Sequence, residues 1–272
     1  MTPPVTPDEL VRQVCSSFDR APNPRTATIM SAAVRHLHAF VQEVGLTPSE
    51  WRTGIEFLTA VGHKCDELRQ EFILLSDTLG VSMLIEMINE GPASGATEAT
   101  VLGPFYVEEP IPRSFGDSIV DDSRTAGTPL VLSGTVRDLA GRPIPRATID
   151  VWQVQPNGLY DIEEDPRKRN LRGQFLTDDN GRYEVRTVRP VDYTIPDDGP
   201  VGEMLEATGR PSWRPAHIHL KVAADGFKTL VTHVFDDASP WLGQDAVFGV
   251  RPSIITGMGD GNSRFDVALE NI

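Results

Sequence analysis

The segment Arg214-Pro-Ala-His217-Ile-His219 constrains this chain most, because two histidines at this spacing can share a partner in extended backbone but not in a helix. Apolar residues recur with a short period from His217 to Val222, which predicts a β-strand. Side chains two positions apart on a strand point to the same face. Two neutral imidazoles there form half of a metal site. A single His-x-His pair is more often structural, so the interpretation depends on further ligands.

Two tyrosines could supply those ligands. The chain has only four tyrosines, and Tyr160 and Tyr193 both lie at the ends of strand-like segments, where binding groups are common. Two phenolates and two imidazoles suit a hard, oxidised metal ion, and ferric iron is the natural candidate. Arg214 could stabilise negative charge on a substrate bound there. Taken singly, Tyr160 and Tyr193 could be packing residues and Arg214 a surface residue.

Residues 1–92 are predicted to be helical. Asn23-Pro24 predicts a helix start and Gly45 its end, with an apolar stripe from Ile29 to Val44 between them. Thr47-Pro48-Ser49-Glu50 is a capping box that begins the next helix. We expect two further helices: one that carries Leu68, Phe72 and Leu75 and ends near Gly80, and one over residues 81–89.

The apolar period changes to two from about residue 130. Turn residues separate five predicted strands, at residues 131–136, 147–152, 183–188, 217–222 and 230–235. The predicted fold class is therefore α+β, with an all-helical N-terminal domain followed by a catalytic antiparallel β-sandwich. The expected divisions are residues 1–92, a linker and pocket wall over residues 93–129, and the sandwich over residues 130–272.

Charge and cysteine content exclude several classes of function. The net charge of −14, from 39 acidic and 25 basic residues, argues against nucleic acid or an anionic membrane as a partner. Cys15 and Cys65 are far apart, which supports neither a disulfide framework nor a cysteine zinc site. We find neither a signal peptide nor a membrane span and expect a cytoplasmic protein.

The Tyr…Tyr…Arg-Pro-x-His-x-His pattern resembles that of the intradiol catechol dioxygenases, over nearly the whole chain. The resemblance implies one non-haem Fe(III) per subunit, bound by Tyr160, Tyr193, His217 and His219. It also implies that Tyr193 leaves the metal and takes a substrate proton, while Arg214 stabilises a carbanion-like ring carbon. Tyr193 and Arg214 are thus the expected catalytic residues. The expected role of His233, on the next predicted strand, is packing or support of the ligands.

Within that family the chain is most similar to the subfamily that cleaves hydroxyquinol (benzene-1,2,4-triol). The implied reaction uses O₂ to break the bond between the two ortho hydroxyl-bearing carbons, giving 3-hydroxy-cis,cis-muconate, the enol form of maleylacetate, in aromatic catabolism. Positions that line the substrate pocket of the subfamily correspond here to Leu74, Asp77, Val101, Leu102, Gly103, Pro104, Phe105, Ile195, Pro196, Arg214 and Val247. Asp77 would accept a hydrogen bond from the third hydroxyl; alternatively, it caps the turn near Gly80.

Three other functions fit part of the pattern. A catechol or chlorocatechol 1,2-dioxygenase would use the same iron chemistry. A zinc hydrolase would combine the His pair with a carboxylate such as Asp192. A non-catalytic β-sandwich binding module would explain the fold but leave the four ligands as coincidence. The family resemblance further implies a homodimer through the helical domains, with a phospholipid in a hydrophobic tunnel at the interface.

Overall fold

The computed structural model describes residues 6–67, 69–90, 95–109, 111–165 and 167–272. Two compact units, residues 1–60 and 61–272, divide the chain, and each is described by itself. The expected boundary after residue 92 and the expected helix residue Leu68 lie outside the described residues.

The first unit consists of helices whose ends follow local capping rules. It contains α1 (Pro7–Ser16), α2 (Pro24–Val44) and most of α3 (Pro48–Lys64), and α1 packs against α2. The Asn23 side chain accepts the N–H of Arg25 at 2.9 Å, and α2 ends where Gly45 takes a φ of 60°. Thr47 and Glu50 exchange the two hydrogen bonds of a capping box. The predicted ends of this helix pair are confirmed.

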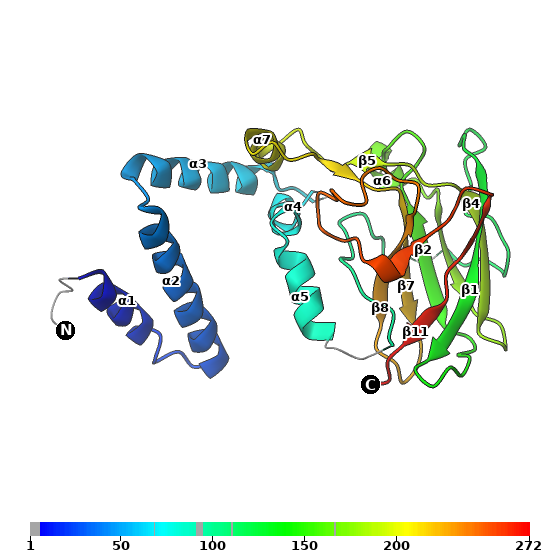
Figure 1. Cartoon of the computed structure of the whole chain (residues 1–272), viewed down its shortest axis with the longest axis horizontal. Coiled ribbons are helices and arrows are strands. Elements are labelled where there is room, and N and C mark those ends of the chain that lie inside the picture. The colour runs from blue at the N-terminus through cyan, green and yellow to red at the C-terminus, as the bar shows by residue number, and fades with distance from the viewer. Residues whose placement is uncertain (1–5, 68, 91–94, 110, 166) are drawn as a thin grey trace. The chain divides into compact units, whose positions relative to one another are not determined.

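The second unit begins with two helices and continues into sheets (Figure 1). The helices are α4 (Glu71–Thr78) and α5 (Val81–Glu90), as expected. Two short helices interrupt the later strands, α6 (Asp161–Glu164) and α7 (Pro200–Ala207), and η1 (Pro252–Ile254) is a 3₁₀ turn. The strands are β1 (Pro129–Asp138), β2 (Thr148–Gln153), β3 (Arg172–Leu176), β4 (Arg182–Val188), β5 (Tyr193–Thr194), β6 (Trp213–Arg214), β7 (His217–Ala223), β8 (Leu230–Asp236), β9 (Ile255–Thr256), β10 (Asn262–Arg264) and β11 (Val267–Leu269).

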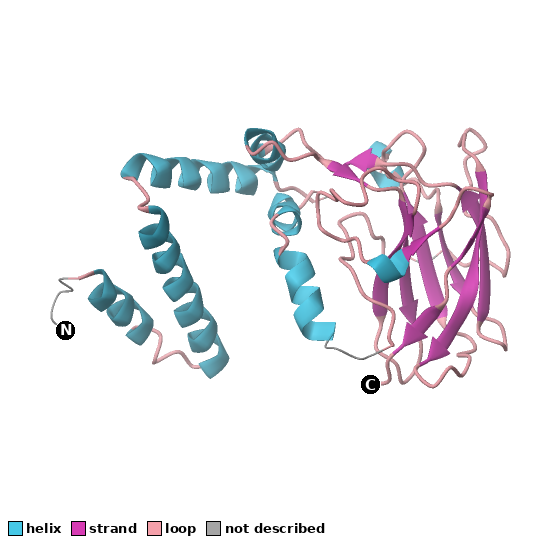
Figure 2. Cartoon of the chain, viewed as in Figure 1, coloured by secondary structure: helices cyan, strands magenta, loops and turns pink. Residues whose placement is uncertain are grey.

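The strands form two main sheets, coloured magenta in Figure 2, and one two-stranded ladder. In the first sheet, β1 pairs with β4 on one edge and with β10 and β11 on the other. The second has the order β3-β2-β7-β8-β9, and β5 pairs with β6. The expectation of a wholly antiparallel arrangement is wrong for β1–β10, β1–β11 and β8–β9, which are parallel. Through these pairs, the C-terminal strands β9, β10 and β11 join strands that lie earlier in the sequence.

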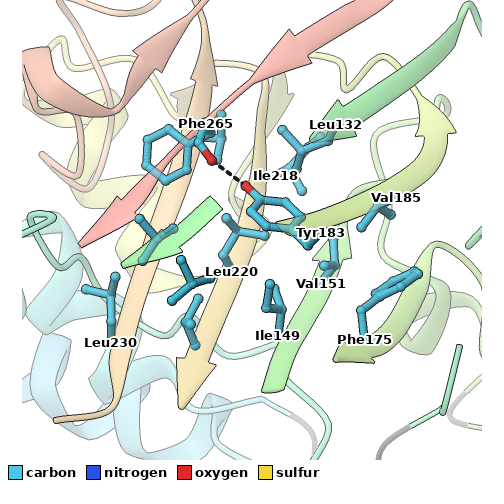
Figure 3. Packing of buried hydrophobic residues seen from close by; sticks show 14 of the residues in the cluster. Leu132, Ile149, Val151, Phe175, Tyr183, Val185, Ile218, Leu220, Leu230 and Phe265 are labelled. Carbon is cyan, nitrogen blue, oxygen red and sulfur yellow. Dashed lines mark hydrogen bonds between the residues drawn. The ribbon is translucent and has the colours of Figure 1, made fainter. Parts of the chain in front are cut away.

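One hydrophobic core takes residues from both main sheets (Figure 3). On β7, Ile218, Leu220 and Val222 enter this core, so the alternation of the strand leaves His217 and His219 on the opposite face. In the core, the Tyr183 hydroxyl donates to the carbonyl of Phe265 at 2.7 Å. The sheet therefore separates an apolar core on one side from polar, buried side chains on the other.

Described residues between α5 and β1 bond to strands of both sheets. Thr100 N–H donates to the carbonyl of Val231 at 2.9 Å, and Ile119 N–H donates to that of Arg186 at 2.9 Å. These bonds fix the backbone at Thr100 and Ile119, in the part of the chain expected to form the pocket wall. Among the described residues, no helix combines the length and apolar character needed to cross a membrane.

Candidate metal centre

His217 and His219 converge as their spacing predicts. Both are buried, and their Nε2 atoms lie 3.1 Å apart. The Nδ1 atom of His217 is 2.7 Å from the carbonyl of Pro215, which can only accept, so Nδ1 carries the proton and Nε2 has its lone pair free. The backbone thus selects the tautomer that a metal needs.

Tyr160 and Tyr193 bring their hydroxyls to the same point. Tyr160 Oη lies 2.8 Å from His219 Nε2 and 3.1 Å from Tyr193 Oη. Tyr160 directly precedes α6, and its N–H donates to Glu163 Oε2 at 2.7 Å. Tyr193 lies on β5, paired with Arg214 of β6. The two hydroxyls and two imidazoles expected from the sequence are therefore brought together.

The spacing of these four atoms fits a single ion. Ligands bonded about 2 Å from one metal lie about 3 Å from each other. Three separations within the set are 2.8, 3.1 and 3.1 Å. Two phenolic oxygens with two imidazole nitrogens form a harder ligand set than the cysteine-rich sites that select zinc or copper(I). The residues present therefore fit a hard, oxidised transition metal.

Burial sets the protonation of the free side chains. It raises the pKa of Tyr160 well above the usual range, helped by neighbouring Tyr193, and it also raises the pKa of Tyr193, against the opposing effect of Arg214. Burial likewise lowers the pKa of His217 and His219 well below the usual value. The imidazoles are neutral and ready to bind, whereas the phenols need a cation before they ionise.

Arg214 lies against the four donors. Its Nη1 is 3.3 Å from both Tyr193 Oη and His217 Nε2. Burial lowers the pKa of Arg214, but Asp245 and the two phenols more than offset this, so the net pKa is raised. The sequence indicated a cation here but not its carboxylate partner, Asp245, which lies 31 residues further along the chain.

A third histidine, His233, packs against the pair. It is opposite His219 on β8, with ring centroids 4.2 Å apart, and its Nδ1 hydrogen-bonds the hydroxyl of Thr100. Among the described residues, His217, His219 and His233 form a group of possible ligands, with atoms within 4.8 Å of one another. The separations of 2.8–3.1 Å among the Tyr160, Tyr193, His217 and His219 donor atoms are shorter than this 4.8 Å limit. These four residues therefore form the better metal site.

Asp192, the carboxylate of the zinc-hydrolase alternative, is used elsewhere. It accepts the N–H of Ala216 at 2.8 Å and the hydroxyl of Ser239. Asp192 therefore anchors the start of the His strand, and in the described part of the chain no carboxylate joins the three-histidine group.

A cleft of about 490 Å³ lies within the second unit, beside Tyr160. Five of the expected pocket residues line it: Leu74, Pro104, Phe105, Ile195 and Pro196. The Phe105 ring stacks on Tyr160 with centroids 4.5 Å apart. The sequence did not indicate the charged residues that also line the cleft: Asp66, Arg69, Glu163, Asp197 and Asp198.

The remaining expected pocket residues lie deeper or elsewhere. Val101, Val247 and Asp77 are buried, and Leu102 lines a separate cavity of about 310 Å³. A Cβ at Gly103 would lie 3.4 Å from Cε1 of His219, so the wall passes directly over this ring. Asp77 is 4% exposed, and no hydrogen-bond partner of its Oδ1 lies among the described residues.

Comparison with known proteins identifies relatives of this chain. A family model described as "Dioxygenase" matches residues 101–269, and one described as "Catechol dioxygenase N terminus" matches residues 23–97. The chain is 46% identical over 247 residues to 6-chlorohydroxyquinol 1,2-dioxygenase of Cupriavidus pinatubonensis, covering 90% of this chain and 89% of that protein. It is 47% identical over 248 residues to hydroxyquinol 1,2-dioxygenase of Nocardioides simplex, covering 91% and 84%.

A solved structure is also similar. Hydroxyquinol 1,2-dioxygenase of Pseudomonas putida superposes with a TM-score of 0.91 at 44% identity, covering 98% of this chain and 99% of that one.

Proposed function

The chain belongs to the intradiol ring-cleavage dioxygenase family, and from this premise we propose that it cleaves hydroxyquinol with O₂. The bond broken lies between the two ortho hydroxyl-bearing carbons, and the product is 3-hydroxy-cis,cis-muconate, the enol form of maleylacetate. The observation that carries the proposal is the convergence of Tyr160, Tyr193, His217 and His219 beside Arg214.

We propose that the four donors hold one Fe(III). When bound, ferric iron supplies Lewis acidity toward the two ortho oxygens of the substrate and draws electron density from the ring. The donor separations and the mixed oxygen and nitrogen set support this assignment. The β-sandwich expected from the sequence forms part of the same proposal, supported by the core that both sheets share.

The two tyrosines have different surroundings, which supports different roles. Tyr160 stacks on Phe105 and its backbone is tied to Glu163, so it stays in place as a ligand. The Arg214 guanidinium lies 3.3 Å from the Tyr193 hydroxyl. Tyr193 is the metal ligand whose Oη accepts a proton from one substrate hydroxyl. Arg214 remains charged and stabilises negative charge on the substrate ring.

Asp77 is the residue proposed to select a third ring hydroxyl. Burial raises the pKa of its carboxyl group, which Ser82 and Arg214 partly oppose. A buried carboxyl oxygen without a partner is costly unless a ligand supplies one. The capping alternative receives no support from the side chain, because Gly80 N–H donates to the main-chain oxygen of Asp77. The proposed pocket also includes Leu74, Val101, Leu102, Gly103, Pro104, Phe105, Ile195, Pro196, Arg214 and Val247.

Turnover of three substrates tests the proposal. Purified protein should contain about one iron per chain, absorb visible light through phenolate-to-iron charge transfer, and consume O₂ with hydroxyquinol faster than with catechol or 4-chlorocatechol. A preference for catechol or 4-chlorocatechol would support the corresponding 1,2-dioxygenase instead. A colourless protein that binds zinc would exclude the whole proposal.

We also propose a homodimer in which residues 1–92 form the interface, residues 93–129 the linker and pocket wall, and residues 130–272 the catalytic part. Large apolar side chains on α2 support this interface, because they are 41–62% exposed in the single chain: Ile29, Met30, Leu37, Phe40, Val41 and Val44. The same apolar surface would take up the expected phospholipid. Light scattering gives the mass of the assembly, and mass spectrometry of an organic extract identifies any lipid.

A further inference from the structure

A row of four buried side chains, one of which is the proposed metal ligand His219, crosses four strands of the second sheet. The register pairs Arg172 of β3 with Trp152 of β2, Trp152 with His219 of β7, and His219 with His233 of β8. Directly paired residues of antiparallel strands point to the same face. All four side chains are at most 6% exposed. The row therefore continues from a proposed metal ligand to an arginine two strands away.

The contact between the inner members is close. The Trp152 and His219 rings stack with centroids 4.6 Å apart and planes inclined by 12°. Trp152 therefore limits rotation of the His219 imidazole. It lies between His219 and Arg172 in the sheet.

Arg172 ends the row in a buried ion pair with Asp161. Its Nε is 2.8 and 2.9 Å from the two carboxylate oxygens, and its Nη2 is 2.6 Å from Oδ1. The Asp161 carboxylate also accepts the N–H of Asn170 at 3.0 Å. Asp161 directly follows Tyr160, so this ion pair fixes the backbone that carries a second proposed ligand.

The backbone beside Arg172 is held in a rare conformation. Leu171 has a φ of 57°, which residues with a side chain seldom adopt, and it is fully buried. Its N–H donates to the carbonyl of Ile119 at 2.8 Å, and its own carbonyl accepts the N–H of Gln153 at 3.2 Å. Such strain persists only where the surroundings determine it, and it is frequent at functional sites.

We infer that Arg172 is a positioning residue for two metal donors at once, Tyr160 through Asp161 and His219 through Trp152. These links meet at the site, because Arg172 is the cross-strand neighbour of Trp152, and Tyr160 Oη lies 2.8 Å from His219 Nε2. This inference rests on the proposed function, since it assigns Arg172 a role toward the iron site. An alternative is that the ion pair only stabilises the fold.

Neutralising both partners separates these roles. The double variant Arg172→Met/Asp161→Asn leaves no buried charge unpaired, and the oxygen of the introduced side-chain amide would still accept the Asn170 N–H. The control is Arg142→Met/Asp138→Asn at the turn after β1, which removes an ion pair between a carboxylate that is 5% exposed and an arginine that is 77% exposed. For each protein we would measure thermal unfolding without iron, iron affinity by competition with a chelator, and the energy of the charge-transfer band.

We expect the Arg172/Asp161 double variant to lose about 10- to 100-fold in iron affinity, the usual effect of removing a partner of a metal ligand, and to shift the band. The control should keep both properties. Arg172→Lys should also bind iron weakly, because one ammonium cannot reproduce the bidentate contact. A folded double variant with native affinity and band would overturn the inference, as would native affinity in Arg172→Lys.

Two further outcomes are distinguishable. If the wild-type protein binds no iron or shows no band, the proposed function fails rather than the role of Arg172. If the double variant does not fold, Arg172→Lys provides the test, because it keeps a positive charge opposite Asp161, and native affinity and band in that variant would refute the inference.

Discussion

Asp245 holds Arg214 with both carboxylate oxygens, at 3.1 Å from Nε and 3.4 Å from Nη2. The carboxylate is itself fixed by the N–H groups of Val247, at 3.3 Å, and Gly249, at 2.8 Å. This arrangement leaves Nη1 of Arg214 as the nitrogen that faces Tyr193 and His217. A loop after β8 thus determines which nitrogen of the guanidinium faces the proposed metal ligands.

Asp245→Asn should lower kcat for hydroxyquinol by about 10- to 100-fold with little change in iron content, because a charged hydrogen bond contributes roughly 1.5–3 kcal/mol. Steady-state kinetics and metal analysis measure the two effects. Asp138→Asn, which alters a buried carboxylate remote from the donors, serves as the control. An unchanged kcat would show that Arg214 keeps its orientation without Asp245.

Asp77→Ala should lower the ratio of kcat/KM for hydroxyquinol over catechol by about 10- to 100-fold, because the third hydroxyl would lose its buried acceptor. Oxygen uptake with each substrate gives the ratio. Asp197→Ala, which alters a carboxylate that lines the 490 Å³ cleft, should leave the ratio unchanged. An unaltered ratio in Asp77→Ala would contradict the proposed role.

Asp198 should stabilise the cleft rim only above about pH 4. Hydrogen bonds from Arg69 and then Lys64 lower the pKa of its carboxyl group from 3.8 to about 2. A carboxyl whose pKa is lower in the folded state binds fewer protons there, so its contribution is present above pH 4 and lost as pH falls toward 2. Because Asp198 is largely exposed, the contribution is at most about 1 kcal/mol.

Unfolding of wild type and Asp198→Asn at several pH values checks this. The wild type should be the more stable protein at pH 6, and the difference should shrink as the pH falls through 2. A difference that does not depend on pH would exclude the ion pair as its cause.

Gly134→Ala should destabilise the second unit by about 3 kcal/mol or more, beyond the usual range for overpacking. The added Cβ would lie 1.8 Å from the carbonyl oxygen of Phe265 and 2.9 Å from the Tyr183 ring. Gly54→Ala in α3 is the comparison, because nothing lies within 4 Å of its Cβ, and it should stabilise the helix by up to about 1 kcal/mol. Urea denaturation measures both, and equal stabilities would contradict the packing argument.

Local signals explain which parts of the fold could be predicted. The cap at Asn23, the stop at Gly45 and the capping box at Thr47 act within a few residues, and they are found as expected. The five predicted strands correspond to β1, β2, β4, β7 and β8. The strands β3, β5, β6, β9, β10 and β11 are mostly two or three residues long, too short for a period to appear.

Long-range partners could not be predicted in the same way. The pairing of β1 with β10 and β11 joins segments separated by more than a hundred residues, and no local pattern sets its direction. For the site, residue chemistry and family resemblance predicted that Tyr160, Tyr193, His217, His219 and Arg214 would lie together, as they do. Asp245, Asp161 and Thr100 escaped notice because an acidic or hydroxyl side chain is common in loops and reveals its partner only after folding.

The ladder formed by β5 and β6 has only two residue pairs, and one of them is Tyr193 with Arg214. So short a ladder is weakly held by its own hydrogen bonds. The backbone positions of Tyr193 and Arg214 consequently depend on a single residue pair, and the buried contact of Arg214 with Asp245 adds the side-chain restraint that the ladder lacks. A substitution in either of these short strands would therefore move both side chains without altering the five-stranded sheet that carries His217 and His219.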